Sequence, residues 1–169
     1  MNTLRHHHAH QLNRLAALDH CDGTQDGSVE CVIPSDLTEA GHIQEVIETQ
    51  LKQSDYDDKE IFGIRLAFEE AVVNAIKHGN QMDRRKNVQV CYRILADRFE
   101  ATITDEGPGY NPTDLPDPRA EENIERPSGR GLFLIKHYMT EVVIPPPGNR
   151  VAMYKLCNGN GQRRFAKKK

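Results

Sequence analysis

Two neighbouring segments with alternating apolar and polar residues constrain the fold of this chain most strongly. The sequences NVQVCYRIL and RFEATITDEG both follow a period of two and are separated by Ala96-Asp97. This period is typical of strands with one buried face, and the short separation favours a hairpin. The apolar face of such a hairpin has to be covered by other elements of the chain.

Segments with helical periodicity precede the hairpin. After the strand-like sequence SVECVIPSD, Ser35 or Asp36 is expected to cap a helix that extends to about Gln53. The apolar side of this helix comprises Leu37, Ala40, Ile43, Val46, Ile47 and Leu51. A second helix is expected from about Asp57 to His78, capped by the acidic sequence SDYDDKE and ended by Gly79-Asn80. Its apolar stripe comprises Ile61, Ile64, Phe68, Ala71, Val72 and Ala75.

The remaining segments complete one α+β domain. A third helix is expected near 131–139, followed by strands at 141–144 and 150–157 that PPPGN joins. This order predicts helices on one face of a mixed, mainly antiparallel sheet. We expect residues 29–157 to form the domain, 1–28 a flexible His-rich extension and 158–169 a basic tail.

Composition argues against several classes of protein. The net charge of -3 and pI of about 6.2 give no overall basic field for direct nucleic-acid binding. No apolar run is long enough for a membrane span, and the His-rich start lacks the apolar region of a signal peptide, so we expect a cytoplasmic protein. The four cysteines are scattered, which favours reduced thiols, mostly in strands.

The second helix also carries a polar stripe. Glu70, Asn74 and Lys77 lie at positions i, i+4 and i+7, away from the apolar stripe. A solvated helix face is the simpler interpretation. An asparagine in mid-helix lowers helix propensity, however, and an exposed one has no packing role.

Two glycine-containing segments follow. Asp105 ends a strand before Gly107-Pro108-Gly109, which is either an ordinary turn or a place where the backbone approaches a ligand. Gly129 and Gly131 precede the third helix, whose free N–H groups could bind phosphate oxygens. Ser128 and Arg130 could add a hydroxyl and a guanidinium there. The long segment 110–128 between them is expected to be a lid or disordered.

In this order, E-A-V-x-N-A-x-x-H-G, D-E-G-P-G and S-G-R-G-L-F-L-I closely resemble the N, G1 and G2 boxes of the GHKL ATPases. The resemblance covers 29–156 and implies the Bergerat nucleotide-binding fold, a two-layer sandwich. The first motif and the stand-alone length look most like the anti-sigma factor serine kinases. Members of that family bind a sigma factor and phosphorylate a small antagonist protein.

The resemblance implies ATP and Mg²⁺ as cofactors and assigns roles to the polar residues. Asn74 matches the magnesium ligand, and Glu70 matches the proposed general base of phosphoryl transfer. Lys77 and Arg130 are candidates for the cationic groups. Asp105 matches the residue that accepts a hydrogen bond from the adenine amino group. The glycines of the two boxes match Gly107, Gly109, Gly129 and Gly131, with Ser128 beside them.

Two positions depart from the family pattern or stay open. Related kinases carry an Arg just before the Ser-Gly of the second glycine box, where this chain has Pro127. Whether Arg126 or Arg130 faces phosphate is therefore open. His78 suits the end of the helix dipole, so we expect a capping or packing role for it rather than a catalytic one.

We therefore expect an ATP-dependent serine/threonine-protein kinase that is also an anti-sigma factor, with a sigma factor and an antagonist protein as partners. One alternative is a nucleotide-gated binding module with little transfer activity. Another is the catalytic domain of a histidine-kinase system, although the first 28 residues are too short for the phosphoacceptor hairpin. Whether the chain forms a homodimer is left open.

Overall fold

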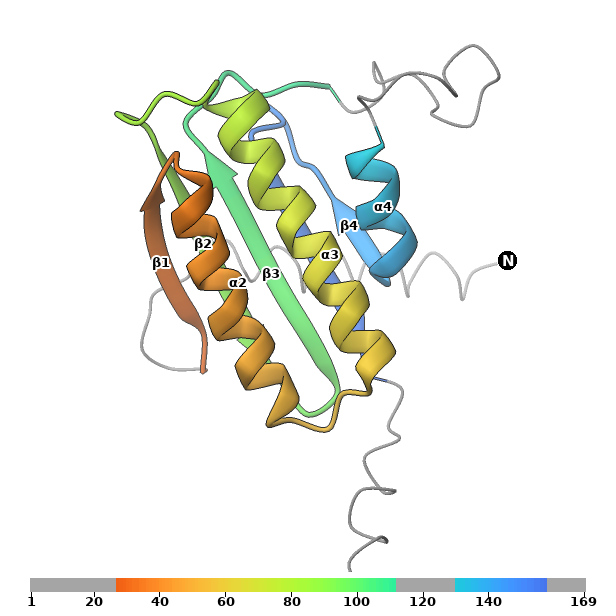
Figure 1. Cartoon of the computed structure of the whole chain (residues 1–169). Helices are drawn as coiled ribbons and strands as arrows, with labels where there is room; N and C mark the ends of the chain where they lie inside the picture. Colours follow the sequence, from red (N-terminus) through yellow and green to blue (C-terminus); the bar gives the residue numbers. More distant parts are fainter. Residues whose placement is uncertain (1–26, 112–129, 158–169) are drawn as a thin grey trace, which may run out of the picture.

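The computed structural model describes residues 27–111 and 130–157, which form a two-layer α+β domain (Figure 1). The elements follow the expected order, with a π-helical segment (Ala75–Gly79) directly after α3. Their bounds are β1 (Val29–Pro34), α2 (Leu37–Lys52), α3 (Asp58–Asn74), β2 (Asn87–Ile94), β3 (Arg98–Asp105), α4 (Gly131–Tyr138), β4 (Glu141–Val143) and β5 (Arg150–Leu156).

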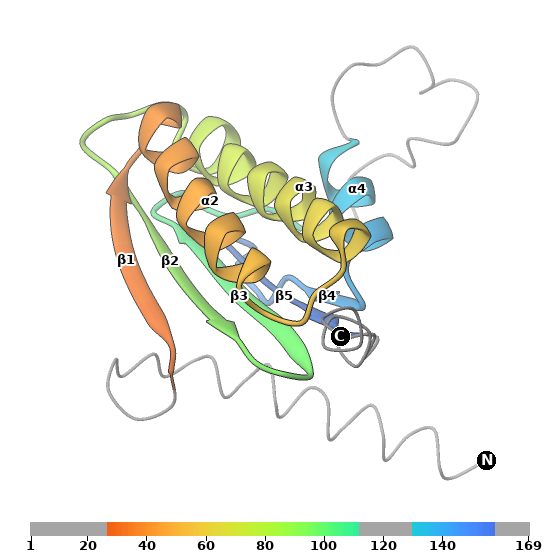
Figure 2. The same cartoon turned by 60° about the horizontal axis from the view of Figure 1, so that its bottom comes forward.

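The five strands form one sheet in the order β1-β2-β3-β5-β4. Every strand pairing in the described part of the chain is antiparallel, so this sheet contains no parallel pair of the kind that a mixed sheet would include. The expected hairpin is β2–β3, in which Ile94 lies opposite Phe99 and Val88 lies opposite Asp105. Figure 2 shows the helices on one side of this sheet.

Side-chain caps fix where the first two helices begin. Asp36 accepts a hydrogen bond from the Thr38 backbone N–H at 2.9 Å, so Asp36 rather than Ser35 is the cap of α2. At α3, Asp57 accepts from the N–H groups of Lys59 and Glu60, and the Glu60 carboxylate accepts from the Asp57 N–H. This reciprocal capping box satisfies N–H groups that have no partner inside the helix.

The core lies between the helices and the sheet. All six residues of the apolar stripe expected on α3 are buried. On α2, Ala40, Ile47 and Leu51 are buried, whereas Leu37 and Val46 are 38% and 51% exposed. The prediction that Leu37 and Val46 belong to the buried side of α2 is wrong. Both residues lie at the margins of the apolar stripe, where side chains face solvent.

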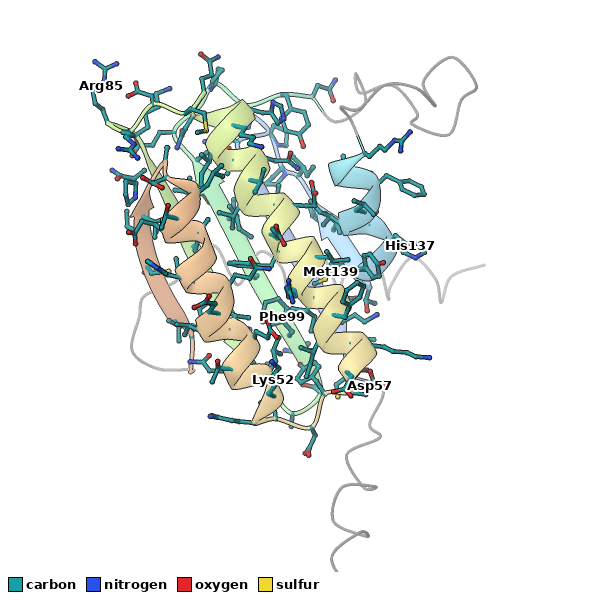
Figure 3. The ribbon with its side chains drawn as sticks, in the orientation of Figure 1. Lys52, Asp57, Arg85, Phe99, His137 and Met139 are labelled. Carbon is teal, nitrogen blue, oxygen red and sulfur yellow. The ribbon has the colours of Figure 1, made fainter. Side chains whose placement is uncertain are left out.

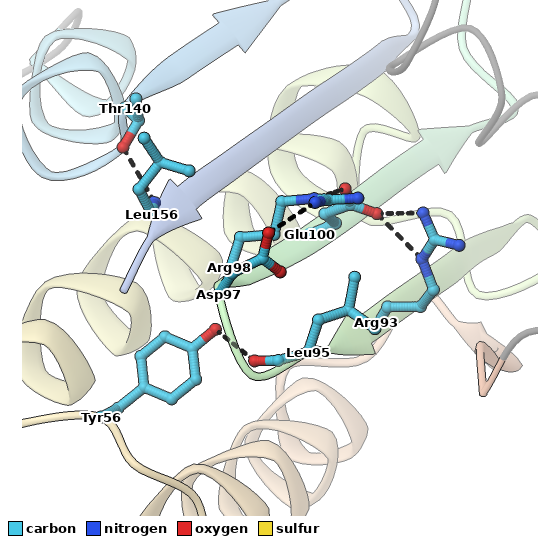
Figure 4. A network of polar contacts seen from close by, with 8 residues as sticks. All are labelled: Tyr56, Arg93, Leu95, Asp97, Arg98, Glu100, Thr140 and Leu156. Atoms are coloured by element: carbon cyan, nitrogen blue, oxygen red, sulfur yellow. Dashed lines mark hydrogen bonds and ion pairs between the residues drawn. The ribbon is translucent and has the colours of Figure 1, made fainter. Parts of the chain in front are cut away.

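A buried ion-pair network stiffens the end of the hairpin opposite Asp105 (Figure 4). The Glu100 carboxylate is only 4% exposed and pairs with both Arg93 and Arg98. Arg93 Nε donates to Glu100 Oε2 at 2.9 Å, and the Tyr56 hydroxyl donates to the Leu95 carbonyl beside it. The Arg93–Glu100 pair links β2 to β3, and the two arginines together offset the cost of burying the Glu100 carboxylate.

The structure also bears on the expectations about the cysteines, about membrane spans and about the terminal segments. Cys31 and Cys157 are not disulfide-bonded, but Cys91 is, so the expectation of reduced thiols is wrong for Cys91. Within the described ranges, no helix combines the length and the apolar character that crossing a membrane requires. The expected N-terminal extension, most of the expected lid and the basic tail lie outside the described residues.

Candidate active site

The polar residues singled out in the sequence gather at one end of the domain. The C-terminal ends of α3 and β3 and the N-terminal end of α4 meet there (Figure 1). Helix α3 packs between α2 and α4, and α4 runs antiparallel to it. Segments far apart in sequence therefore contribute to one site.

Asp105 is the last residue of β3 and is partly buried at this end. Its Oδ1 accepts a hydrogen bond from the Gly107 N–H at 2.8 Å. Burial raises the pKa of Asp105 above its usual range, and the Gly107 hydrogen bond and the Lys86 charge oppose that shift. Oδ2 receives no hydrogen bond from the residues that the structure describes, so it can accept one from a ligand.

Two glycines make room for this carboxylate. A Cβ on Gly79 would overlap the Asp105 carboxyl group. A Cβ on Gly107 would overlap the Gly79 carbonyl and lie 2.7 Å from Asp105 Oδ1. The backbone at Gly107 thus lies very close to the backbone at Gly79. This close contact is compatible with both interpretations of D-E-G-P-G, an ordinary turn and a segment that approaches a ligand. Gly79, which the sequence indicates only as a helix end, is in direct contact with Asp105.

Asn80 holds this arrangement together and was missed as a site residue. Its side chain is completely buried and donates to Ser35 Oγ at 2.9 Å and to the Asn87 carbonyl at 2.8 Å. Its Oδ1 accepts from the Glu106 N–H at 2.8 Å. One amide therefore connects the end of α3 to the start of α2, to β2 and to the residue after Asp105. Nothing local in the sequence signals these distant partners.

The turn between β4 and β5 supports the same segment from its other side. Asn149 Nδ2 donates to the Asp105 carbonyl at 2.8 Å, and the Asp105 N–H donates to the Asn149 carbonyl at 2.9 Å. Gly109 has a φ of +78°, and a Cβ there would overlap the Pro147 carbonyl. Burial raises the pKa of Tyr110, and the charge of Asp105 raises it further.

Glu70 and Asn74 lie directly beside the start of α4. A Cβ on Gly131 would be 2.6 Å from Glu70 Oε2 and 2.8 Å from Asn74 Nδ2. The first and third sequence motifs therefore meet at a glycine that leaves a small cradle over both side chains. Both side chains are partly buried, which a fully solvated helix face would not produce.

The structure describes two of the candidate cationic residues, Lys77 and Arg130, but not Arg126. Lys77 is exposed and lies on the π-helical segment, so the regular α-helical spacing of Glu70 and Asn74 does not continue to it. Arg130 is exposed immediately before α4. Ser128, Gly129 and Arg126 lie outside the described residues, so the choice between Arg126 and Arg130 is as open as the sequence left it.

The donor set at this site suits a magnesium–nucleotide rather than a metal cage. The described part of the chain contains no group of three His, Cys, Asp or Glu residues arranged to hold a metal. Mg²⁺ bound with ATP takes most of its oxygens from phosphates and water. The Asn74 amide beside the Gly131 cradle would be enough to add one protein oxygen.

Residues 33–155 match the family described as the histidine kinase-like ATPase domain, and the chain belongs to that family. Curated relatives are named serine-protein kinase RsbW. The one from Bacillus subtilis (strain 168) is 28% identical over 138 residues, covering 78% of this chain and 86% of the relative. The one from Staphylococcus epidermidis is 32% identical over 121 residues, covering 64% and 75%.

A solved structure has the same fold. It contains the RsbU and RsbW domains of Rv1364c from Mycobacterium tuberculosis, and it superposes with a TM-score of 0.53 over 78% of this chain and 32% of that one. At 16% identity this match shows the fold alone. The expected α+β fold and the resemblance to GHKL ATPases are confirmed, and ATP use and serine-protein kinase activity agree with the family and with the relatives' names.

Proposed function

We propose that this chain transfers the γ-phosphate of ATP to a serine or threonine of a small anti-sigma antagonist protein, and that it also binds a sigma factor. The position of Glu70 and Asn74 at the Gly131 cradle carries this proposal. Glu70 and Asn74 face the start of α4, and they do so at the same end of the domain as Asp105. A sigma-factor partner would place the chain in the cytoplasm.

Asp105 would recognise the adenine base. Its Oδ1 is already engaged by Gly107, and Oδ2 would accept a hydrogen bond from the adenine amino group. Guanine presents a carbonyl acceptor at the corresponding position, which a carboxylate cannot satisfy. Gly107 and Gly109 would let the backbone pass beneath the nucleotide, and Asn80 and Asn149 hold that backbone in place.

Glu70 would act as the general base. Its carboxylate would take the proton from the acceptor hydroxyl as the hydroxyl oxygen attacks the γ-phosphorus and ADP leaves. Asn74 would contribute an oxygen to Mg²⁺, which neutralises phosphate charge when it is bound. Lys77 and Arg130 would add positive charge near the phosphates. Gly131 would offer a hydrogen-bond donor at the start of α4, and Ser128 and Gly129, which precede it in the sequence, are expected to add donors.

The test is direct phosphorylation. Purified chain is incubated with γ-labelled ATP or GTP and each small antagonist-type protein of the same host, and the labelled residue is identified by mass spectrometry. We expect serine or threonine labelling with ATP and at least about tenfold less with GTP, since the adenine hydrogen bond is worth about 1.5–3 kcal/mol. Labelling of histidine, or tight ATP binding with no labelled protein, would contradict the proposal.

A further inference from the structure

Four aromatic rings form a continuous row on the outer surface of α3 and α4. The Phe62 and Tyr138 rings are 6.1 Å apart between centroids and meet edge to face. Tyr138 contacts His137 at 4.9 Å, and His137 stacks with Phe133 at 6.4 Å. We call these four residues the aromatic row. Figure 3 shows His137 at the outer surface of α4.

The two phenylalanine rings of the aromatic row are apolar and exposed, whereas Tyr138 is partly buried and packs against the core. Phe62 and Phe133 are 53% and 41% exposed. Tyr138 is seated on Gly63, where a Cβ would lie 2.9 Å from its Cδ1 atom, so the backbone of α3 is shaped to hold this ring. Single exposed apolar side chains need no explanation, but a contiguous row of rings usually marks a binding surface.

The charge around the aromatic row has one sign on α4. The helix and the residue before it carry Arg130 and Lys136 and no carboxylate. A partner that covers the row would therefore need carboxylates beside its apolar contact. A second copy of this chain placed symmetrically would bring the same cations against each other, which disfavours self-association through this surface.

The aromatic row lies close enough to the reaction site for one partner to cover both. Gly131, beside Glu70, and Tyr138 stand at opposite ends of the eight-residue helix α4, which is about 12 Å long. A stable protein contact covers about 800 Å² on each partner, or a disc of about 16 Å radius. A folded acceptor whose hydroxyl reaches Glu70 can therefore cover the aromatic row in the same contact.

We propose that the aromatic row is the docking surface for the acceptor protein of phosphoryl transfer, which would present an apolar patch bordered by carboxylates. This inference rests on the proposed kinase function. It adds a surface outside the nucleotide site that selects the acceptor. Substitutions in the aromatic row should accordingly change the KM for the acceptor protein and leave the affinity for ATP unchanged.

The experiment compares steady-state phosphorylation of the acceptor protein identified by the labelling test above. The variants are Phe62→Ala, Phe133→Ala, the double variant and Lys136→Glu. Val32→Ala, on the exposed surface of β1 at 60% exposure, is the matched control. We expect the double variant to raise the KM for the acceptor at least about tenfold, since exposed aromatic anchors often dominate contacts. ATP affinity should stay within twofold in all variants, and Lys136→Glu should raise the KM most at low salt.

Three results would overturn the inference. An unchanged acceptor KM in the double variant, with wild-type transfer intact, removes the docking role and leaves the kinase function standing. A change in oligomeric state or in thermal stability with the acceptor KM unchanged assigns the row to a second copy or to packing within the chain. If the wild type phosphorylates no protein, the kinase function is wrong and the docking inference is wrong with it.

Discussion

Replacing Asp105 by Asn separates nucleotide recognition from stability. Asn has the same shape, so its oxygen can still accept from the Gly107 N–H, and it adds no atom against Gly79. The group that faces a ligand becomes an NH₂ donor in place of a carboxylate oxygen. Opposite the adenine amino group, two donors would then meet.

The lost interaction sets the expected size of the effect. A hydrogen bond to a charged group is worth about 1.5–3 kcal/mol. At about 1.4 kcal/mol per factor of ten, ATP should bind about tenfold to a hundredfold more weakly to Asp105→Asn. Titration calorimetry with ATP and GTP measures this change, and we expect the preference for ATP over GTP to shrink by a similar factor.

The same substitution has an opposite effect on folding. Because burial raises the pKa of Asp105, the folded state holds the proton more tightly than the unfolded state does. The contribution of Asp105 to stability is therefore complete below the usual pKa of 3.8 and is lost as the pH rises through the raised value. At neutral pH the free energy of unfolding of Asp105→Asn should equal or exceed that of the wild type, and this advantage should disappear below the usual pKa.

Urea unfolding at neutral and acidic pH checks the sign. Glu106→Gln is the matched control, since the neighbouring carboxylate is exposed and, among the described residues, accepts a hydrogen bond only from Asn87. The control should change neither ATP affinity nor the pH dependence. Unchanged ATP affinity in Asp105→Asn, or a clear loss of stability at neutral pH, would refute the reasoning.

Three further substitutions test the rest of the site. Asn74→Ala should weaken ATP binding in the presence of Mg²⁺ and have little effect without it, as measured by calorimetry with and without a chelator. Asn80→Ala should lower the free energy of unfolding by about 1–3 kcal/mol in urea titrations, because it leaves the partly buried Glu106 N–H and Asn87 carbonyl without their partner. Gly131→Ala should reduce ATP affinity with a melting temperature close to that of the wild type, since its Cβ would fill the cradle over Asn74.

Local patterns predicted the frame of the domain. The helix starts and the buried stripe of α3 depend on residues within one or two helical turns, so the sequence indicated them, although it left Ser35 and Asp36 open as the first cap. The exposure of Val46 could not be predicted in this way, because it depends on how α2 is rotated against the sheet. Whether a residue at the margin of an apolar stripe is buried or exposed depends on tertiary packing and not on the helical periodicity of the sequence.

The site was predictable as a set of motifs and not as a geometry. Glu70, Asn74 and Asp105 were identified because their motifs resemble a known family. Asn80 and Asn149 escaped that reasoning because their partners are distant in sequence and are reached only when the sheet and helices are assembled. The roles of Ser128 and Gly129 remain predictions, as those residues lie outside the described ranges.

A single-turnover comparison of two adjacent carboxylates tests the central claim most directly. Glu70 lies at the Gly131 cradle, whereas Glu69 points to the other side of α3 and accepts a hydrogen bond from Gln44 at 3.1 Å. With saturating ATP and acceptor protein, rapid-quench measurements should show that Glu70→Ala slows phosphoryl transfer at least about a hundredfold, the scale of a lost general base. Its ATP affinity should be retained, and Glu69→Ala should transfer at the wild-type rate. Equal transfer rates for the two variants would contradict the account and make the polar stripe of α3 an ordinary helix surface.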